Sequence, residues 1–313
     1  MYDARLGLDI AGIDLVTEDI GSPLGPQGGA IVEVNAGPAL HMHLKPASGE
    51  KRPVGEAIVE SLFPDGATGR IPIVCVTGTT LQDAVARLVA RIVGSTTPRV
   101  GLTCADGSYF AGRRLESGNR ADAPSARKLL MNPTLEAGVF AADAEGILRE
   151  GLAFDRCDVA VITDISADAQ FPAHFIATPQ DVVAVLRCPV DIVPPTGFAV
   201  LNAADPLVAA MAGWSDGPVV FFAASPDHPV LAAHCAGGGR AVSVCDGRIA
   251  LLAGSEVTPV LAADQCLHIG VGERIETVLA ATAAAWSLGI LPNDIAACLL
   301  NVERPGQSGQ GVC

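Results

Sequence analysis

Apolar and polar positions change their pattern along the chain near residue 64. Two apolar stretches before this point, 6–16 and 30–37, predict short strands, and residues 52–63 have the spacing of an amphipathic helix. The next residues, 64–70, hold turn formers without periodicity, which is typical of a linker. We therefore expect a small N-terminal part that is separate from the rest of the chain.

Continuous apolar runs alternate with helical periods in the longer part of the chain. Residues 71–76 form an apolar run typical of a strand covered on both faces, and residues 81–92 carry apolar side chains at helical spacing. The same patterns predict further strands at 99–107, 137–142, 158–165 and 197–203, a hairpin arm at 108–116, and helices at 125–131 and 179–186. This alternation predicts an α/β fold, with a mostly parallel sheet and helices on both faces.

Short strands predominate after residue 217 and make 218–262 a β-rich segment. The dipeptide Asp246-Gly247 between two apolar runs is a hairpin signal. Two helical periods follow, at 273–288 and 292–300. The tail, 305–313, has no packing residues, and we expect it to fray.

Composition and charge exclude several classes of function. Half of the 313 residues are apolar, and the formal net charge is −14. Nucleic-acid binding needs clustered Lys and Arg, and the sequence has no such stripe. It also has no signal-peptide pattern and no apolar segment long enough to span a membrane. The nine cysteines include no C-x-x-C pair, so we expect a reducing, cytoplasmic environment without disulfides.

A turn between the strand at 71–76 and the following helix has the layout of a phosphate-binding loop. Such a loop needs glycines that let backbone N–H groups approach phosphates, a Lys that balances their charge, and a hydroxyl that holds Mg²⁺. The residues present are Thr77, Gly78, Thr79, Thr80, Leu81, Gln82 and Asp83. The loop keeps its first glycine but has neither the Lys nor a hydroxyl in the expected place.

Several longer segments carry a resemblance to a known family. They are LDIAGIDLV, GGAIVEVNAGPALHMHL, GRIPIVCVTGT, SARKLLMNPTLEAGVF, GILREGLAFDRCDVAVITDI, GFAVLNAADPLV and AHCAGGGRAVSV. In this order they resemble the cyanophycin synthetases. The resemblance implies that 1–64 is the end of an ATP-grasp domain, 65–70 a linker, and 71–304 the central, ATPase-type part of a Mur-ligase-like domain. Members of that family use ATP and Mg²⁺ to build an Asp–Arg polymer. Their ATP-grasp domain adds Asp to the backbone, and their Mur-like domain adds Arg to the Asp side chain.

The departures from the family pattern fall on its nucleotide and metal positions. In T-G-T-N-G-K-T-T the second glycine becomes Leu81, the lysine becomes Gln82, and the magnesium hydroxyl becomes Asp83. A metal-binding Glu position is Ala141, and a His position is Ala169. The adenine-contacting Asn of a later helix corresponds to Thr277. The chain also ends where the C-terminal lobe of such ligases is expected to begin.

These departures predict a noncatalytic scaffold or docking domain. We assign no catalytic residue and no metal ligand, and we expect neither ATP nor Mg²⁺ as a cofactor of this chain. The expected partners are a second copy, a protein with an ATP-grasp domain, or the cyanophycin polymer itself, and neither nucleic acid nor membrane. The alternative is residual nucleotide, anion or ligase chemistry in a remodelled pocket, because backbone amides at a helix N-terminus still attract anions.

Two groups of candidates lie outside the loop in the N-terminal part and the hairpin arm. Glu33 and Asn35 match the metal-binding E-x-N strand of ATP-grasp enzymes, without the rest of that site. His41 and His43 form either a metal pair with Glu33 or a polar strand end. The arm carries two arginines beside two aromatic residues, and it either contacts a polymer or subunit or is a solvated tip. These residues are Arg113, Arg114, Tyr109 and Phe110.

Four further candidates follow strands of the predicted sheet. Asp164 and Asp168 come after the strand at 158–165, where they either bind a cation together or serve in capping and solvation. Asn202 and Asp205 match a family segment close to the nucleotide. Their alternative role is a turn and a helix N-cap, because Asp205-Pro206 is a favourable helix start.

Overall fold

The computed structural model describes residues 8, 10–266 and 274–301. It divides into two compact units, Met1–Arg70 and Ile71–Cys313. The tail predicted to fray, 305–313, lies outside the described residues.

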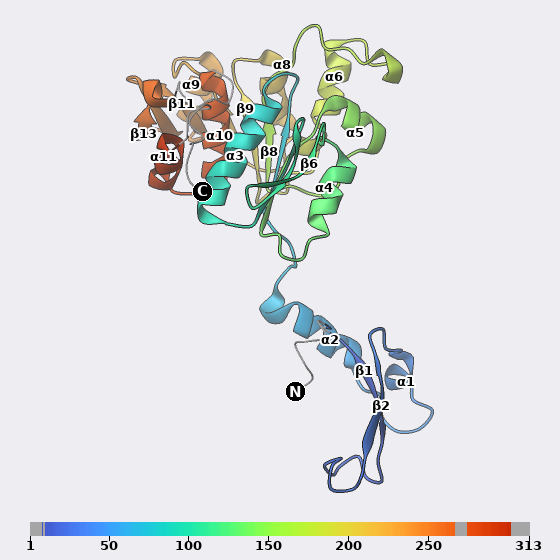
Figure 1. The fold of residues 1–313 in the computed structure, drawn as a ribbon. Helices are drawn as coiled ribbons and strands as arrows, with labels where there is room; N and C mark the ends of the chain where they lie inside the picture. Colours follow the sequence, from blue (N-terminus) through green and yellow to red (C-terminus); the bar gives the residue numbers. More distant parts are fainter. Residues whose placement is uncertain (1–7, 9, 267–273, 302–313) are drawn as a thin grey trace, which may run out of the picture. The chain divides into compact units, whose positions relative to one another are not determined.

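The first unit is a small antiparallel ribbon with two helices (Figure 1). Strands β1 (Gly12–Val16) and β2 (Ala30–Asn35) pair with Ile13 opposite Val34 and Asp14 opposite Glu33. Helices α1 (His41–Leu44) and α2 (Val54–Leu62) follow, with a 3₁₀ turn at Pro64–Gly66. None of the described residues before Ile71 is buried. The described residues of this unit therefore form no hydrophobic core, and a two-stranded ribbon without a covered face is only marginally stable in water.

The prediction that His41 and His43 lie on a strand is wrong. They belong to the single helical turn α1, in which the Lys45 N–H donates to the His41 carbonyl oxygen over 2.8 Å. Residues two positions apart on a helix do not share a face, so the helical turn does not present the two imidazoles side by side. In the described part of the chain no group of three or more His, Cys, Asp and Glu side chains is arranged to hold a metal ion.

The second unit is built on one mixed sheet that contains every described strand after Arg70. The order is β13-β12-β11-β10-β9-β8-β3-β7-β4-β5-β6, parallel from β11 to β4 and antiparallel at both ends. The strands are β3 (Ile73–Thr77), β4 (Val100–Cys104), β5 (Gly107–Phe110), β6 (Arg113–Ser117), β7 (Ala137–Ala141), β8 (Val159–Ile162), β9 (Phe198–Asn202), β10 (Val219–Phe222), β11 (Arg240–Cys245), β12 (Arg248–Ala253) and β13 (Glu256–Ala262).

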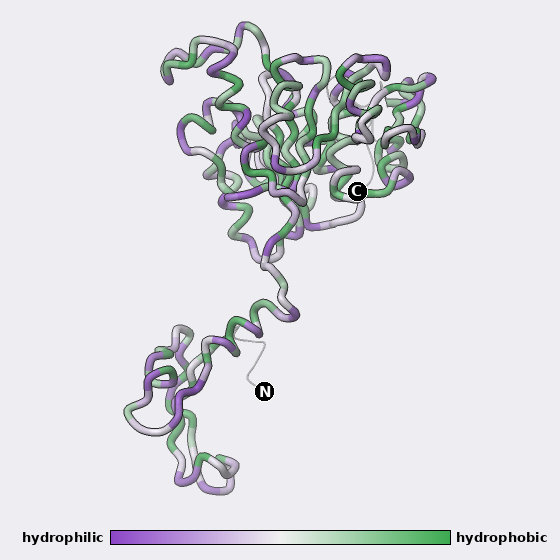
Figure 2. Tube along the Cα trace, turned by 180° about the vertical axis from the view of Figure 1, so that it is seen from behind, coloured by the Kyte–Doolittle hydropathy of each residue, from purple (hydrophilic) through white to green (hydrophobic). Residues whose placement is uncertain are grey.

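Helices cover both faces of this sheet, as the alternation of apolar runs predicts. Helices α3 (Gln82–Thr96), α10 (Ile275–Ser287) and α11 (Pro292–Leu300) pack in one core with Val74 and Val76 of β3. The other core contains Cys75, whose side chain points to the opposite face. Around it lie α5 (Ala144–Glu150), α6 (Pro179–Leu186), α7 (Cys188–Asp191), α8 (Pro206–Ala209) and α9 (Pro229–Ala236), while α4 (Ala123–Leu130) packs on Phe140. Figure 2 shows hydrophobic positions concentrated along the central strands.

The β-rich segment at 218–262 extends this sheet. Strand β10 runs parallel to β9, with Phe222 opposite Asn202, and β11 runs parallel to β10. The predicted hairpin at Asp246-Gly247 joins β11 to β12, and both turn residues have positive φ, 49° and 73°. Helix α9 lies within the segment and was not expected. The predicted α/β fold is confirmed, and the segment belongs to its one sheet.

Two findings concern the helices and the cysteines of the described residues. No described helix is both long and apolar enough to cross a membrane. The eight described cysteines are all free thiols.

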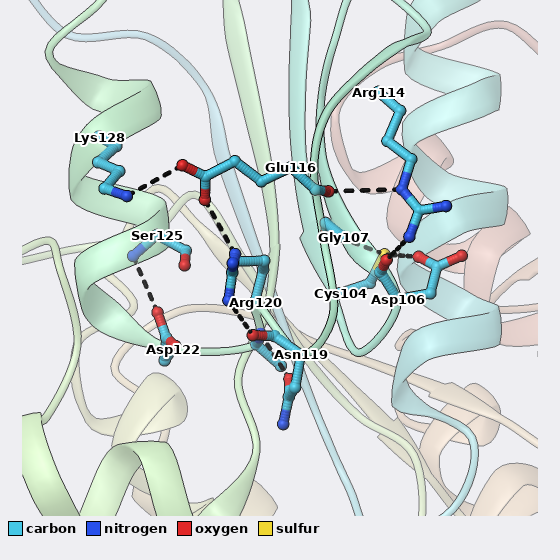
Figure 3. A network of polar contacts seen from close by, with 11 residues as sticks. Cys104, Asp106, Gly107, Arg114, Glu116, Asn119, Arg120, Asp122, Ser125 and Lys128 are labelled. Atoms are coloured by element: carbon cyan, nitrogen blue, oxygen red, sulfur yellow. Dashed lines mark hydrogen bonds and ion pairs between the residues drawn. The ribbon is translucent and has the colours of Figure 1, made fainter.

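Asp106, in the turn between β4 and β5, ties the base of the hairpin arm β5–β6 to α3. Figure 3 shows its contacts with Cys104 and Arg114. The Asp106 carboxylate accepts hydrogen bonds from Arg87 Nη1 at 2.6 Å, Tyr109 Oη at 3.1 Å and Cys104 Sγ at 3.1 Å. Arg114 donates to the Asp106 carbonyl oxygen and its guanidinium lies over the Tyr109 ring, so it belongs to the arm's own network although it is exposed. A solvated tip therefore describes Arg113 better than Arg114.

Replacing Asp106 by Asn is expected to destabilise the protein in a pH-dependent way. Burial raises the pKa of Asp106, but the hydrogen bonds from Arg87 and Cys104 outweigh burial and lower it to about 2. The ionised form thus stabilises the fold above the ordinary pKa, and this contribution disappears as the pH falls through about 2. We expect a loss of about 1 kcal/mol at pH 7, because the side chain is 45% exposed and solvent screens the ion pair.

Urea denaturation of the wild type and Asp106→Asn at pH 7 and pH 2.5 measures this difference. The difference in free energy of unfolding between the wild type and Asp106→Asn should shrink at pH 2.5. The control Asp227→Asn, at an exposed position, should change the stability little at either pH. A difference that is the same at both pH values would contradict the assignment.

Candidate functional site

A cleft of about 430 Å³ lies at the carboxyl ends of β3, β7 and β8. This edge of a parallel sheet is the usual place for a ligand in α/β folds. The loop after β3, the start of α5 and the segment after β8 line it. The lining residues are Gly78, Thr79, Thr80, Gln82, Asp143, Ala144, Glu145, Ser166, Asp168, Ala169, Gln170 and Phe171.

Gly78 allows the loop to approach the end of β8 closely. A Cβ atom at this position would overlap the Thr163 hydroxyl, so only glycine leaves room for that side chain. The Thr79 N–H then donates to the Asp164 carbonyl oxygen over 3.1 Å, and Ser166 N–H donates to Thr79 Oγ1 over 2.9 Å. The loop is thus fixed to a segment that follows it by more than eighty positions in the chain.

The Asp164 carboxylate occupies the inside of this loop. It accepts hydrogen bonds from Thr79 Oγ1 at 2.5 Å, Thr80 Oγ1 at 2.8 Å and Leu81 N at 3.1 Å. Burial raises the pKa of this carboxyl, but the hydrogen bonds, first among them the one from Thr79, outweigh burial and leave the pKa below its ordinary value. Asp164 is therefore a half-buried anion that caps the start of α3.

Asp164 and Asp168 do not act as one pair. Asp168 is exposed and lines the cleft, while Asp164 is directed to the loop. Capping was one of the two expected roles, but the helix capped is α3, which the sequence does not place beside residue 164. Sequence reasoning missed one signal. Asp164 is an acid that comes just after β8, and β8 pairs with β3, the strand that leads into the loop.

The side chains of Leu81 and Asp83, two of the departures from the family pattern, are directed away from the cleft. The Leu81 side chain is 9% exposed and packs in the core beneath α3, while its N–H still faces the loop. The Asp83 carboxylate accepts the Ala105 N–H over 2.6 Å at the β4–β5 turn, and Asp83 is not among the described residues that line the cleft. The start of α3 sets the directions of both side chains. The periodicity of the sequence does not show which elements lie beside this helix.

Gln82 and one of the two alanine positions line the cleft. Gln82 lines it, and its Oε1 atom is buried without a hydrogen-bond partner among the described residues. Ala169 also lines the cleft, whereas Ala141 is buried at the end of β7. In α10, Thr277 is fully buried and its hydroxyl likewise has no partner in the described part of the chain.

Three carboxylates and no Lys or Arg occur among the described lining residues. They belong to Asp143, Glu145 and Asp168. Asp143 also serves as the N-cap of α5, where it accepts the Gly146 N–H over 2.6 Å. Asp143 and Glu145 were not predicted to line the site, although they directly follow β7 at the same edge of the sheet. The described lining of the cleft is therefore acidic.

Asn202 and Asp205 use their side chains within the fold. Asn202 Nδ2 donates to the Thr163 carbonyl oxygen over 2.8 Å. Asp205 accepts the Leu207 and Val208 N–H groups as the N-cap of α8, and the Ile165 N–H over 2.7 Å. The predicted N-cap role of Asp205 is confirmed. Glu33 and Asn35 lie on β2 of the first unit.

Comparison with known proteins gives the chain its relatives. No family model matches it. It is 39% identical over 294 residues to the cyanophycin synthetase of Synechocystis sp., a match that covers 94% of this chain and 32% of the relative. The chain is homologous to cyanophycin synthetases over most of its length. For the cyanophycin synthetase of Geminocystis herdmanii the identity is 38%, over 91% of this chain and 33% of the relative. The chain thus spans about a third of the length of these relatives.

Solved structures support the fold independently. A UDP-N-acetylmuramoyl-L-alanyl-D-glutamate–2,6-diaminopimelate ligase aligns with a TM-score of 0.59 at 15% identity, over 80% of this chain and 50% of its own. FolC of E. coli aligns with a TM-score of 0.51 at 14% identity, over 76% and 58% of the two chains. These likenesses identify the fold as Mur-ligase-like.

Proposed function

We propose that this chain is a noncatalytic scaffold or docking module of cyanophycin metabolism, derived from an ATP-dependent amide ligase. Its homology to cyanophycin synthetases supports the metabolic setting, and its Mur-ligase-like fold supports the origin of the larger unit. On this view the degenerate loop and the substituted metal positions no longer serve ATP and Mg²⁺. Another domain or protein adds Arg to the polymer.

The charge of the cleft is the observation that carries this proposal. A triphosphate would meet Asp143, Glu145 and Asp168 with no lining Lys or Arg among the described residues. Two like charges roughly 4 Å apart repel by about 1 kcal/mol in bulk water and about 4 kcal/mol near a protein surface. Gln82, at the lysine position, offers a neutral amide that cannot offset this repulsion.

Calorimetric titration of the purified chain with ATP and Mg²⁺ tests the proposal. We expect no heat of binding up to millimolar nucleotide. Micromolar binding that is abolished by Thr79→Val but kept by Thr134→Val would overturn it, because Thr79 lines the cleft and Thr134 is an exposed residue outside it. That result would instead support the alternative of nucleotide or anion chemistry in a remodelled pocket.

The first unit supports a role in docking. Its two strands and two helices bury none of the described side chains, and several apolar ones are well exposed. Among these are Val16 at 63%, Val32 at 66% and Val59 at 57% exposure. Contiguous exposed apolar surface marks interaction sites, and these side chains are the candidates for one in this unit. The proposed occupant is a protein with an ATP-grasp domain, with a second copy of this chain as the other candidate; the cyanophycin polymer is the proposed ligand of the assembly.

Limited proteolysis of the isolated chain is expected to remove the first unit and leave the second. Segments without buried side chains open at little free-energy cost, whereas the sheet from β3 to β13 must unfold as a whole to be cut. Mass spectrometry should find early cleavage before Ile71 and a lasting fragment that contains 71–301. Resistance of residues 10–70 in a chain that is dimeric by light scattering would instead identify a second copy as the partner.

A further inference from the structure

The donors of the loop after β3 converge on a carboxylate of the same chain. The first N–H groups of an α-helix have no partner within the helix, and they form the positive end of its dipole. In α3 this end includes the Leu81 N–H, and two threonine hydroxyls stand beside it. All three donate to Asp164 at 2.5–3.1 Å. This is the hydrogen-bonding environment that an oxoanion would otherwise take.

The position of Asp164 is imposed by the sheet. Strand β8 pairs with β3 in a parallel register that sets Thr77 opposite Ile162. The Thr163 N–H donates to the Thr77 carbonyl oxygen over 3.0 Å, and the Thr163 hydroxyl donates to Asp164 Oδ1 over 2.8 Å. The backbone of residue 164 is also held, because its carbonyl oxygen accepts the Thr79 N–H. The carboxylate thus meets the loop through a rigid element and needs no lid or moving segment.

We propose that Asp164 is an internal ligand of the loop at 77–82, which holds the loop in shape without a nucleotide and blocks the binding of an oxoanion there. It is an autoinhibitory contact built from one side chain. The inference rests on the proposed function in one respect, since it explains how the loop keeps its shape after nucleotide binding is lost. Its two consequences are a loop that is ordered without ligand and an anion site that opens when the carboxylate is removed.

Thermal unfolding of the full chain with and without inorganic pyrophosphate, at constant ionic strength, tests the second consequence. The wild type should show the same midpoint in both conditions. Asp164→Ala should unfold about 5 °C lower, because several hydrogen bonds are lost, and pyrophosphate should restore part of this loss in a saturable way. Asp168→Ala is the matched control, since it removes a carboxylate that lines the neighbouring cleft and does not bond to the loop donors, and this variant should behave as the wild type does.

An Asp164→Ala protein that ignores pyrophosphate would overturn the proposal, as would an equal response of the wild type or of Asp168→Ala. Flat Mg-ATP titrations of the wild type would in that case leave the proposed function standing. Conversely, if the wild type binds ATP, the proposed function is wrong. The comparison with pyrophosphate then still decides whether Asp164 competes with an anion for the loop.

Amide hydrogen exchange of the unchanged protein tests the first consequence even where Asp164→Ala does not fold. The Leu81 amide should exchange at least about tenfold more slowly than the first-turn amide of Asn293, because α11 has no side-chain cap hydrogen bond. The isosteric Asp164→Asn should raise the Leu81 rate and leave that of Asn293 unchanged. Equal rates for the two amides in the wild type would overturn the proposal.

Discussion

Phe222→Ala is expected to lower the free energy of unfolding of the larger unit by about 3–5 kcal/mol. Phe222 is fully buried on β10, in the core that α3 and α10 share. Truncation removes its transfer free energy and leaves a cavity, because neighbouring strands of a sheet cannot collapse to fill it. The loss should appear as one cooperative transition, since β10 lies between β9 and β11 in the sheet.

Phe175→Ala is the matched control for this change. Phe175 is 93% exposed, and its truncation should alter stability by no more than about 0.5 kcal/mol. Urea denaturation followed by circular dichroism measures both variants. A separate, early transition in Phe222→Ala with the rest of the unit unchanged would contradict the single sheet and favour an independent β-rich segment at 218–262.

Gly78→Ala is expected to cost about 2–3 kcal/mol, because the added Cβ collides with the Thr163 hydroxyl at the end of β8. The Thr163 hydroxyl bonds to the Thr77 carbonyl oxygen and to Asp164 Oδ1, so it turns away from the added Cβ only by losing these hydrogen bonds. The same measurement by urea denaturation applies. The loop should also lose its contacts with Asp164, which would raise the exchange rate of the Leu81 amide.

Two companion variants make this prediction specific. Gly94→Ala, in the last turn of α3, meets no heavy atom within 4 Å and should stabilise the protein by about 0.5 kcal/mol. Thr163→Ala removes the colliding oxygen, so the double variant with Gly78→Ala should recover part of the loss that the single variant causes. A Gly78→Ala protein as stable as the wild type would contradict the close approach.

Much of the fold was predictable because its elements have strong periods. The buried run at 71–76 and the helical period at 81–92 correspond to β3 and α3, and Asp246-Gly247 to the β11–β12 turn. The failures lie where the local signal is weak. His41–Leu44 forms a helical turn within a short polar stretch, and α9 was overlooked because its apolar residues surround the helix without a clear face.

The loop residues illustrate what a motif leaves open. The sequence identifies Leu81, Gln82 and Asp83 as departures, but it does not tell where each side chain points. In the structure only Gln82 of these three lines the cleft, because Leu81 enters the core and Asp83 binds the β4–β5 turn. The acid inside the loop is Asp164, at a distance in sequence that no local pattern spans.

The sequence by itself determined the α/β class, the strands and helices with strong periods, and the positions at which the phosphate-binding pattern is broken. These follow from side-chain periodicity and residue chemistry, which act over a few neighbours along the chain. Only the tertiary structure decided that β10 to β13 extend one sheet, that the first unit buries no described side chain, and that Asp164 occupies the loop. The reason is physical: strand register and burial depend on contacts between segments far apart in the chain, and the pairing of β3 with β8 is what brings residues 79 and 164 within a hydrogen bond of each other.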